Sequence, residues 1–150
     1  MMSQDTIRFQ RLRPEALLPK RATEGSAGMD LTACIDQPVL LPKGGRALIP
    51  TGLAVALPGS HLASFVFARS GLAVKHGVTL SNCVGVIDSD YRGEIKVGLI
   101  NQGDEDYTIQ PGERIAQLVV MPVCCLPIEE CDQLDETQRG AGGFGSTGKV

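Results

Sequence analysis

The residue types with the most chemical potential lie close together near the middle of the chain, in the run Gly85–Ile95. It contains two aspartates, Asp88 and Asp90, followed directly by Tyr91 and Arg92. A carboxylate can act as a general base, and a guanidinium can clamp an anion. A turn requires only small residues with permissive backbone angles. The run is therefore either an ordinary acidic turn or part of a site.

Residues on both sides of this run alternate in the way that half-buried strands do. They are Val78, Leu80, Asn82 and Val84 before the run, Val86 at its start, and Ile95, Val97 and Leu99 at its end and beyond. Alternation on both sides of a Gly- and Asp-rich bend predicts a β-hairpin.

A second polar group, Arg69, Ser70 and Gly71, stands at the start of a short predicted helix over Gly71–His76. We expect Ser70 to be its N-cap and Gly77 to end it. A helix start offers unpaired N–H donors, and arginine adds a bidentate anion contact. The alternative interpretation is a capped helix beside a solvated arginine.

Four further polar residues have both a structural and a functional interpretation. Asp30 is either a turn residue or part of a site. Gln117 lies in an otherwise apolar predicted strand, so its amide needs partners either in the core or on a ligand. His61 and His76 lie apart without metal-ligand spacing, which favours surface or core roles for both.

The composition of the 150 residues favours one globular domain, with 43% apolar and 21% charged residues. The net charge of −3 argues against a general nucleic-acid or anionic-membrane binder. The N-terminal run lacks the apolar stretch of a signal peptide, and no window is long enough to span a membrane. The five cysteines show no metal-finger spacing, so we expect buried free thiols in a cytoplasmic protein.

Short apolar runs separated by turn residues recur along the chain and predict an all-β sandwich, barrel or jelly roll. The predicted strands include Thr6–Leu12, Ala47–Leu57, Leu62–Ala68 and Ile115–Val120.

The end of the chain has a different character. Pro127–Gln138 carries five acidic residues and no basic one, which predicts a solvated connector. The twelve residues from Arg139 contain five glycines, so we expect a mobile tail. That tail is either a frayed terminus or a segment that wraps an anion with its N–H groups and hydroxyls.

Five segments of the chain, taken in order, resemble the five motifs of the trimeric dUTPase (deoxyuridine triphosphate nucleotidohydrolase) family. They are AGMDL from Ala27, ARSGLA from Ala68, NCVGVIDSDYRGEI from Asn82, GERIAQL from Gly112 and RGAGGFGSTG from Arg139. The resemblance covers nearly the whole chain. One departure is Ala68, which stands where the second motif usually has proline and should alter loop stiffness more than chemistry.

The resemblance implies a jelly-roll fold with one short helix, assembled as a homotrimer whose active sites are shared between subunits. It implies hydrolysis of dUTP to dUMP and pyrophosphate with Mg²⁺, which keeps uracil out of DNA and supplies dUMP for thymidylate synthesis. The β-barrel domain would span residues 1–138, and residues 139–150 would form a flexible Gly-rich lid.

By similarity, Asp88 is the catalytic carboxylate, which deprotonates a water for in-line attack on the α-phosphorus. Tyr91 would pack under the deoxyribose and exclude a 2′-hydroxyl, while Asp90 would mainly support the turn. Asp30 would contact the hydrated Mg²⁺ through water. The uracil would be held by the hairpin at Asn82, Gly85, Val86 and Ile87.

The phosphate contacts implied by the resemblance come from two parts of the chain. Arg69, Ser70 and Gly71 would hold the phosphates with Gln117 beside them. In the tail, Arg139, Ser146 and Thr147 would contact the β- and γ-phosphates, Phe144 would cover the uracil, and Gly145 would also bind substrate.

Three other functions explain fewer of these residues. A dCTP deaminase of the same superfamily needs a proton-relay arrangement at the cytosine ring, whereas the central run and the tail resemble the hydrolase. Loss of Asp88 or of the tail would favour a non-catalytic nucleotide sensor, and both are present. A purely structural jelly roll leaves the five polar motifs unexplained.

Overall fold

The structure is a computed structural model that describes residues 6–146 and 148. Those residues form eleven strands and one short helix, which confirms the all-β prediction. The strands are β1 (Arg8–Arg11), β2 (Met29–Thr32), β3 (Val39–Leu41), β4 (Arg46–Pro50), β5 (Leu53–Ala56), β6 (Leu62–Phe67), β7 (Val78–Leu80), β8 (Gly85–Ile87), β9 (Lys96–Asn101), β10 (Tyr107–Ile109) and β11 (Arg114–Pro122), and the helix is α1 (Ser70–His76).

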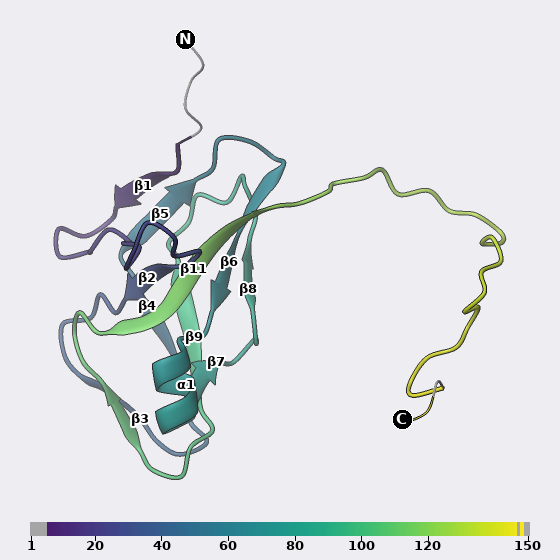
Figure 1. The fold of residues 1–150 in the computed structure, drawn as a ribbon. Coiled ribbons are helices and arrows are strands. Elements are labelled where there is room, and N and C mark those ends of the chain that lie inside the picture. The colour runs from purple at the N-terminus through teal and green to yellow at the C-terminus, as the bar shows by residue number, and fades with distance from the viewer. Residues whose placement is uncertain (1–5, 147, 149–150) are drawn as a thin grey trace.

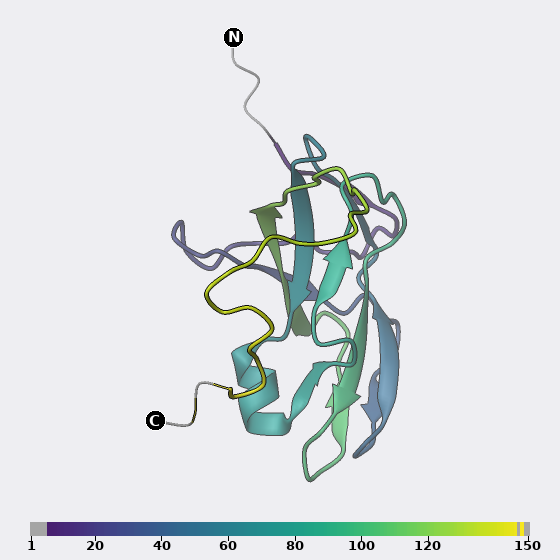
Figure 2. The same cartoon turned by 90° about the vertical axis from the view of Figure 1, so that its right-hand side faces the viewer.

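Two antiparallel sheets position the functional residues. One has the strand order β2-β11-β6-β8 and the other β4-β9-β7, while β1-β5 and β10-β3 form two-stranded sheets. Alternate residues of these strands face one apolar core; in β9, for example, Val97 and Leu99 are buried, whereas Lys96 is exposed. Figures 1 and 2 show α1 at one end of this body, beside β7.

The predicted hairpin around the acidic run is confirmed for its outer part and wrong for its inner part. The first flank begins in β7, which pairs antiparallel with β9 of the second flank. It ends in β8, which pairs with β6 in the other sheet. Alternation reports which residues are buried but does not report the partner strand. The loop between β8 and β9 therefore crosses from one sheet to the other.

The predicted strand over Ala47–Leu57 is two strands, β4 and β5, separated at Thr51 and Gly52. Gly52 has a φ of 67°, and a Cβ there would lie 2.9 Å from both Ala16 Cβ and Cys34 Sγ. The chain changes direction where only glycine fits. Because Ile49 and the residues from Thr51 to Val55 are buried, the pattern of burial continues through the break and conceals it.

The helix α1 starts one residue earlier than predicted, and its N-cap is Arg69, without a side-chain capping bond. The prediction of Ser70 as the N-cap is therefore wrong. Gly77 ends the helix as predicted, with a φ of 70° and its N–H bonded to the carbonyls of Ala73 and Leu72.

All five cysteines are free, but only Cys34 is buried, and its burial raises the pKa of its thiol. The prediction of buried thiols is therefore wrong for Cys83, Cys124, Cys125 and Cys131, which are exposed. Both histidines are exposed, and the ring of His76 lies 5.0 Å from that of Tyr107. No helix in the described part of the chain is long and apolar enough to cross a membrane.

The connector over residues 127–138 is exposed along its whole length, as predicted. Figure 1 shows that the chain leaves the body after β11 and that the connector and the tail extend away from it.

Candidate active site

The first of the two pockets that gather most of the predicted site residues has a volume of about 370 Å³ and lies between the β7–β8 turn, the β8–β9 loop and β9. We call it the base pocket. It is lined by Val66, Leu80, Asn82, Gly85, Val86, Ile87, Asp88, Tyr91, Glu94, Ile95, Lys96, Val97 and Gly98. The structure thus brings together the predicted contacts at Asn82, Asp88 and Tyr91, with the backbone of β8 between them.

The turn that presents Asn82 is fixed by its own backbone. The N–H of Cys83 donates to the carbonyl of Leu80 at 3.2 Å, and the N–H of Val84 donates to the backbone carbonyl of Asn82 at 2.7 Å. Cys83 has a φ of 65°, an uncommon value for a residue other than glycine. The Asn82 side chain is exposed at the pocket.

The opposite wall of the base pocket is an edge of β9, which sequence reasoning missed. The N–H of Ser81 donates to the carbonyl of Gly98 at 2.9 Å, so the backbone groups of Gly98 point toward β7. Lys96 lies two residues before Gly98, so its backbone groups point to the same side of β9. No residue of β7 pairs with Lys96, because β7 ends at Leu80. The backbone groups of Lys96 therefore face the pocket. The alternation of Ile95, Val97 and Leu99 in the sequence indicated this strand but not its free edge.

The β8–β9 loop holds Tyr91 and Arg92 through its own carbonyls. The Tyr91 hydroxyl donates to the carbonyl of Glu94 at 3.0 Å, and Arg92 Nη1 donates to the carbonyl of Ser89 at 2.7 Å. The Glu94 side chain in turn accepts from the N–H of Gly52 at 3.0 Å. The bond between Glu94 and Gly52 anchors the loop at the break between β4 and β5. Asp88, in the same loop, is exposed at the pocket.

The second pocket, which we call the phosphate pocket, has a volume of about 420 Å³ and lies between β2, the start of α1 and β11. Its lining brings together the predicted contacts Asp30, Arg69, Ser70, Gly71 and Gln117. The register places Gln117 of β11 opposite both Asp30 and Phe67. Because β6 leads directly into α1, residues far apart in sequence meet here.

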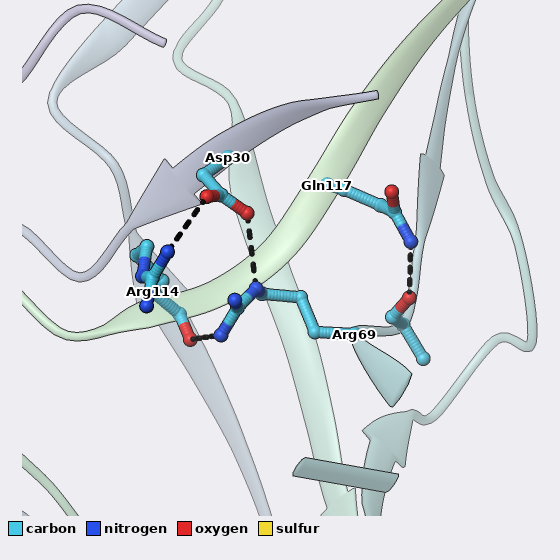
Figure 3. A network of polar contacts seen from close by, with 5 residues as sticks. Asp30, Arg69, Arg114 and Gln117 are labelled. Carbon is cyan, nitrogen blue, oxygen red and sulfur yellow. Dashed lines mark hydrogen bonds and ion pairs between the residues drawn. The ribbon is translucent and has the colours of Figure 1, made fainter. Parts of the chain in front are cut away.

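Asp30 lies in β2 rather than in a turn, and its carboxylate is shared by two arginines (Figure 3). Arg69 Nε donates to Oδ1 at 3.0 Å, and Arg114 Nη1 donates to Oδ2 at 3.3 Å. Arg69 Nη1 also donates to the carbonyl of Arg114 at 3.3 Å. The two guanidinium groups outnumber the one carboxylate, so the network keeps a net positive charge for an anion. Sequence reasoning had not selected Arg114.

Gln117 supports the backbone in front of Arg69. Its Nε2 donates to the carbonyl of Ala68 at 2.9 Å (Figure 3). A Cβ at Gly28 would lie 2.3 Å from Oε1 of Gln117, so glycine leaves the space that this amide occupies. The side chain is half-buried and lines the pocket, which makes it both a structural partner and a group at the site.

The donor set of the phosphate pocket fits a hydrated metal ion. Asp30 is the one carboxylate among its lining residues, and the described part of the chain contains no group of three metal-ligating side chains. Mg²⁺ keeps several of its waters and commonly binds through one or two carboxylates together with substrate phosphates. Because Asp30 already accepts from Arg69 and Arg114, it would hold Mg²⁺ only through water and together with the phosphates of a bound substrate.

The tail residues lie away from both pockets (Figure 1). Arg139 Nε donates to the carbonyl of Gly142 at 2.8 Å, and the N–H of Ser146 donates to that of Gly143 at 3.0 Å. Phe144 is fully exposed, and Gly145 follows it with a φ of 83°. The structure therefore does not bring these predicted contacts to a pocket of the same chain. Thr147 lies outside the described residues.

The base pocket and the phosphate pocket have no lining residue in common. On one chain, the residues predicted to bind a base and those predicted to bind phosphates are thus separate.

Residues 15–148 match the dUTPase family. The chain is 57% identical to the deoxyuridine 5'-triphosphate nucleotidohydrolase of Desulfitobacterium hafniense (strain DSM 10664 / DCB-2) over 131 residues, 87% of each chain. It is 53% identical to the protein of that name from Hahella chejuensis (strain KCTC 2396) over 139 residues, covering 93% of this chain and 91% of the relative.

Solved structures with the same fold confirm the jelly-roll arrangement. A mutant of the Staphylococcus bacteriophage 80alpha dUTPase with dUpNHpp superposes with a TM-score of 0.87 at 24% identity, covering 95% of this chain and 98% of that chain. A mutant dUTPase from phage phi11 of S. aureus, described with a structural Mg(II) ion, superposes with a TM-score of 0.77 at 22% identity. The match covers 86% of this chain and 98% of that chain.

Proposed function

The chain belongs to the dUTPase family and is an enzyme of that family, and from that premise we propose that it hydrolyses dUTP to dUMP and pyrophosphate. The reaction would supply dUMP for thymidylate synthesis and keep uracil out of DNA. One observation carries the proposal for this chain: Asn82, Asp88 and Tyr91 line a single pocket beside a free strand edge.

Base selection would rest on the hydrogen-bond pattern of uracil, which presents an acceptor, a donor and an acceptor along its edge. The amide of Asn82, the backbone of Gly85–Ile87 and the backbone groups of Lys96 can match that pattern across the base pocket. Cytosine would place a donor against a donor and leave polar groups unpaired, at about 1–3 kcal/mol each.

Sugar selection would rest on Tyr91, whose ring position is limited on two sides. Its hydroxyl is bonded to the carbonyl of Glu94, and a Cβ at Gly93 would lie 2.3 Å from that hydroxyl. A ring held in this way under a deoxyribose leaves no space for a ribose 2′-hydroxyl. Tyr91 therefore discriminates dUTP from UTP in this proposal.

The chemical step would use Asp88 as general base. Its carboxylate accepts a proton from a water as the water oxygen attacks the α-phosphorus. The bond from that phosphorus to the bridging oxygen breaks, and pyrophosphate leaves in line with the attacking oxygen. Asp88 is exposed at the base pocket, where such a water has access. Asp90 does not line that pocket and would mainly support the turn.

The triphosphate would bind to Arg69, Ser70 and Gly71, with Gln117 holding the backbone before Arg69. Asp30 would hold a hydrated Mg²⁺ through water. When bound, this ion neutralises charge on the phosphate oxygens.

Because the two pockets share no residue on one chain, we propose a homotrimer in which the base pocket of one subunit faces the phosphate pocket of another. The β-barrel domain, assigned to residues 1–138 with the acidic connector included, carries these pockets. Residues 139–150 act as a lid on a neighbouring site, with Arg139, Ser146 and Thr147 on the β- and γ-phosphates, Gly145 beside them and Phe144 over the uracil. We expect a cytoplasmic enzyme with no nucleic-acid or membrane partner.

The test is pyrophosphate release from dUTP, dCTP, dTTP and UTP, each measured with and without Mg²⁺. Strong turnover of dUTP alone, which falls when Mg²⁺ is chelated, is the expected result. Comparable turnover of dCTP or UTP would reject the proposed specificity.

A further inference from the structure

The end of the β8–β9 loop is fixed to the break between β4 and β5 by four hydrogen bonds. Thr51 donates its N–H and its Oγ1 hydroxyl to the carbonyl of Ile95, at 3.2 Å and 2.6 Å. The N–H of Ile95 donates to the carbonyl of Leu53 at 2.7 Å. The N–H of Gly52 donates to Oε1 of Glu94 at 3.0 Å. Only this last bond uses a side chain of the loop, so a single substitution in the loop can remove it while the other three remain.

The break between β4 and β5 is a rigid anchor for this bond. Gly52 packs so closely that an added Cβ would lie 2.9 Å from atoms of two buried side chains. Its carbonyl accepts from the N–H of Leu12 at 2.8 Å, and its N–H is used by Glu94. Thr51 and Leu53, on either side of it, are 0% exposed. The atom that binds the Glu94 carboxylate therefore has little freedom to move.

Glu94 connects this anchor to the ring of Tyr91. Its carbonyl accepts from the Tyr91 hydroxyl at 3.0 Å, while its carboxylate accepts from Gly52. The side chain is 23% exposed, and its second oxygen lies 3.8 Å from Nζ of Lys96, which is beyond hydrogen-bond distance. A hydrogen bond from an N–H to an ionised carboxylate is stronger than one between neutral groups. The bond to Gly52 is therefore the strongest polar contact of this side chain.

The remaining hydrogen bonds of the loop, in the described part of the chain, are internal to it. The N–H of Tyr91 donates to the carbonyl of Asp88 at 3.2 Å, and Arg92 Nη1 donates to the carbonyl of Ser89 at 2.7 Å. These bonds give the loop its shape, but they move with it. The ring of Tyr91 therefore keeps its place relative to the body through Glu94.

We propose that Glu94 is a positioning residue for sugar selection, because its carboxylate fixes the part of the loop to which the Tyr91 ring is bonded. A ring excludes a ribose 2′-hydroxyl only if it cannot retreat from it. The inference rests on the proposed function, in which Tyr91 lies under the deoxyribose. It adds that selection of the sugar depends on a contact with Gly52, which does not line the base pocket.

Four substitutions separate the hydrogen bond from the charge and from general stability. Glu94→Ala removes the acceptor, and Glu94→Asp keeps the charge but shortens the reach by one methylene. Glu94→Gln removes the charge and keeps an acceptor oxygen. The control for stability is Ile49→Val, which removes a methylene group from a side chain of β4 that is 2% exposed and lowers the melting temperature through packing.

The first readout is kcat/KM for dUTP and for UTP. In Glu94→Ala and Glu94→Asp, the value for UTP should rise and that for dUTP should fall, so that their ratio shifts roughly tenfold toward UTP. Glu94→Gln and Ile49→Val should keep the ratio of the wild type. Loss of stability alone lowers both values, so a rise for UTP identifies a loss of positioning.

A second readout needs no turnover. The chain has two tyrosines, Tyr91 and Tyr107, so fluorine NMR of protein labelled with fluorotyrosine should give two ring signals, which Tyr107→Phe assigns. The Tyr91 signal should move toward the shift of the free amino acid in Glu94→Ala and Glu94→Asp, because the ring becomes mobile. It should keep the wild-type shift in Glu94→Gln and Ile49→Val.

A moved Tyr91 signal and an altered ratio in Glu94→Ala or Glu94→Asp, with both properties retained in Glu94→Gln, establish the positioning role. An unmoved signal, or a ratio altered equally by Glu94→Gln or Ile49→Val, would overturn it. A wild-type chain that does not hydrolyse dUTP rejects the proposed function alone, because the Tyr91 signal tests the positioning without turnover.

Discussion

The base pocket and the phosphate pocket of this chain are built in different ways. Apart from Val66, the lining of the base pocket comes from Leu80–Gly98, one continuous stretch held by backbone hydrogen bonds. The phosphate pocket joins β2, α1 and β11 through a carboxylate shared by two arginines. The first is suited to recognising shape and hydrogen-bond pattern, and the second to holding charge.

This difference indicates where each kind of change will act. Substitutions in the base pocket should alter the chemical step or the identity of the nucleotide. Substitutions in the phosphate pocket should alter the affinity for the triphosphate.

The largest effect should come from Asp88→Asn in the base pocket. Asparagine keeps the shape of the side chain but cannot accept the proton, so turnover of dUTP should fall about 1,000-fold while nucleotide binding is retained. Pyrophosphate release and calorimetric titration with dUpNHpp measure the two properties. Asp90→Asn is the matched control in the same loop and should lose far less. An unchanged rate in Asp88→Asn would remove Asp88 as the base.

Deletion of residues 139–150 should have the next largest effect, because the lid is proposed to serve both pockets. Turnover should fall about 100-fold, since the triphosphate is no longer aligned and shielded from water. The melting temperature should hardly change, since the hydrogen bonds of the described tail residues are local to the segment from Thr137 onward. Full activity in the truncated protein would refute the lid.

Arg69→Gln should show how the phosphate pocket differs from the base pocket. The KM for dUTP should rise about 10- to 100-fold, with a smaller change in kcat, because a contact present before and during reaction is lost. Inhibition by dUMP, which has one phosphate, should change much less. Arg114→Gln should have a smaller effect of the same kind, because Arg114 acts through Asp30. An equal loss for dUMP and dUTP would contradict the division between the pockets.

Gly28→Ala should give the smallest effect. The added methyl group would displace the Gln117 amide from the carbonyl of Ala68, which costs about 1 kcal/mol of stability and raises the KM for dUTP a few-fold. The double variant Gly28→Ala/Gln117→Ala removes the clash. Its melting temperature should lie above the value expected if the two single effects were additive. Strict additivity would show that the clash does not exist.

The sequence was sufficient to group three polar residues of the base pocket because they are neighbours along the chain. One segment of ten residues contains Asn82, Asp88 and Tyr91, and all three belong to a single motif of the family. The same local pattern could not identify the pairing of β8 with β6, because burial alternates in the same way with any partner strand. The edge of β9 at Lys96 follows from that pairing and was missed for the same reason.

The phosphate pocket was harder to predict because it depends on distant pairs. Nothing near Asp30 in the sequence indicates that Arg114 will reach its carboxylate, since 84 positions separate the two residues. Cys124 and Cys125 were misjudged because the apolar run in which they stand was assumed to be buried. The run continues beyond the end of β11, outside the core.

The central claim is that one site combines the base pocket of one subunit with the phosphate pocket of another. Its most direct test is to refold Asp88→Asn subunits together with Arg69→Gln subunits and to measure pyrophosphate release from dUTP. When equal amounts of the two subunits assemble at random, an intact base pocket meets an intact phosphate pocket at about a quarter of all sites. We predict recovery of about a quarter of wild-type turnover at a dUTP concentration that leaves Arg69→Gln trimers nearly inactive. A mixture no more active than the average of its two parent trimers would contradict the shared site.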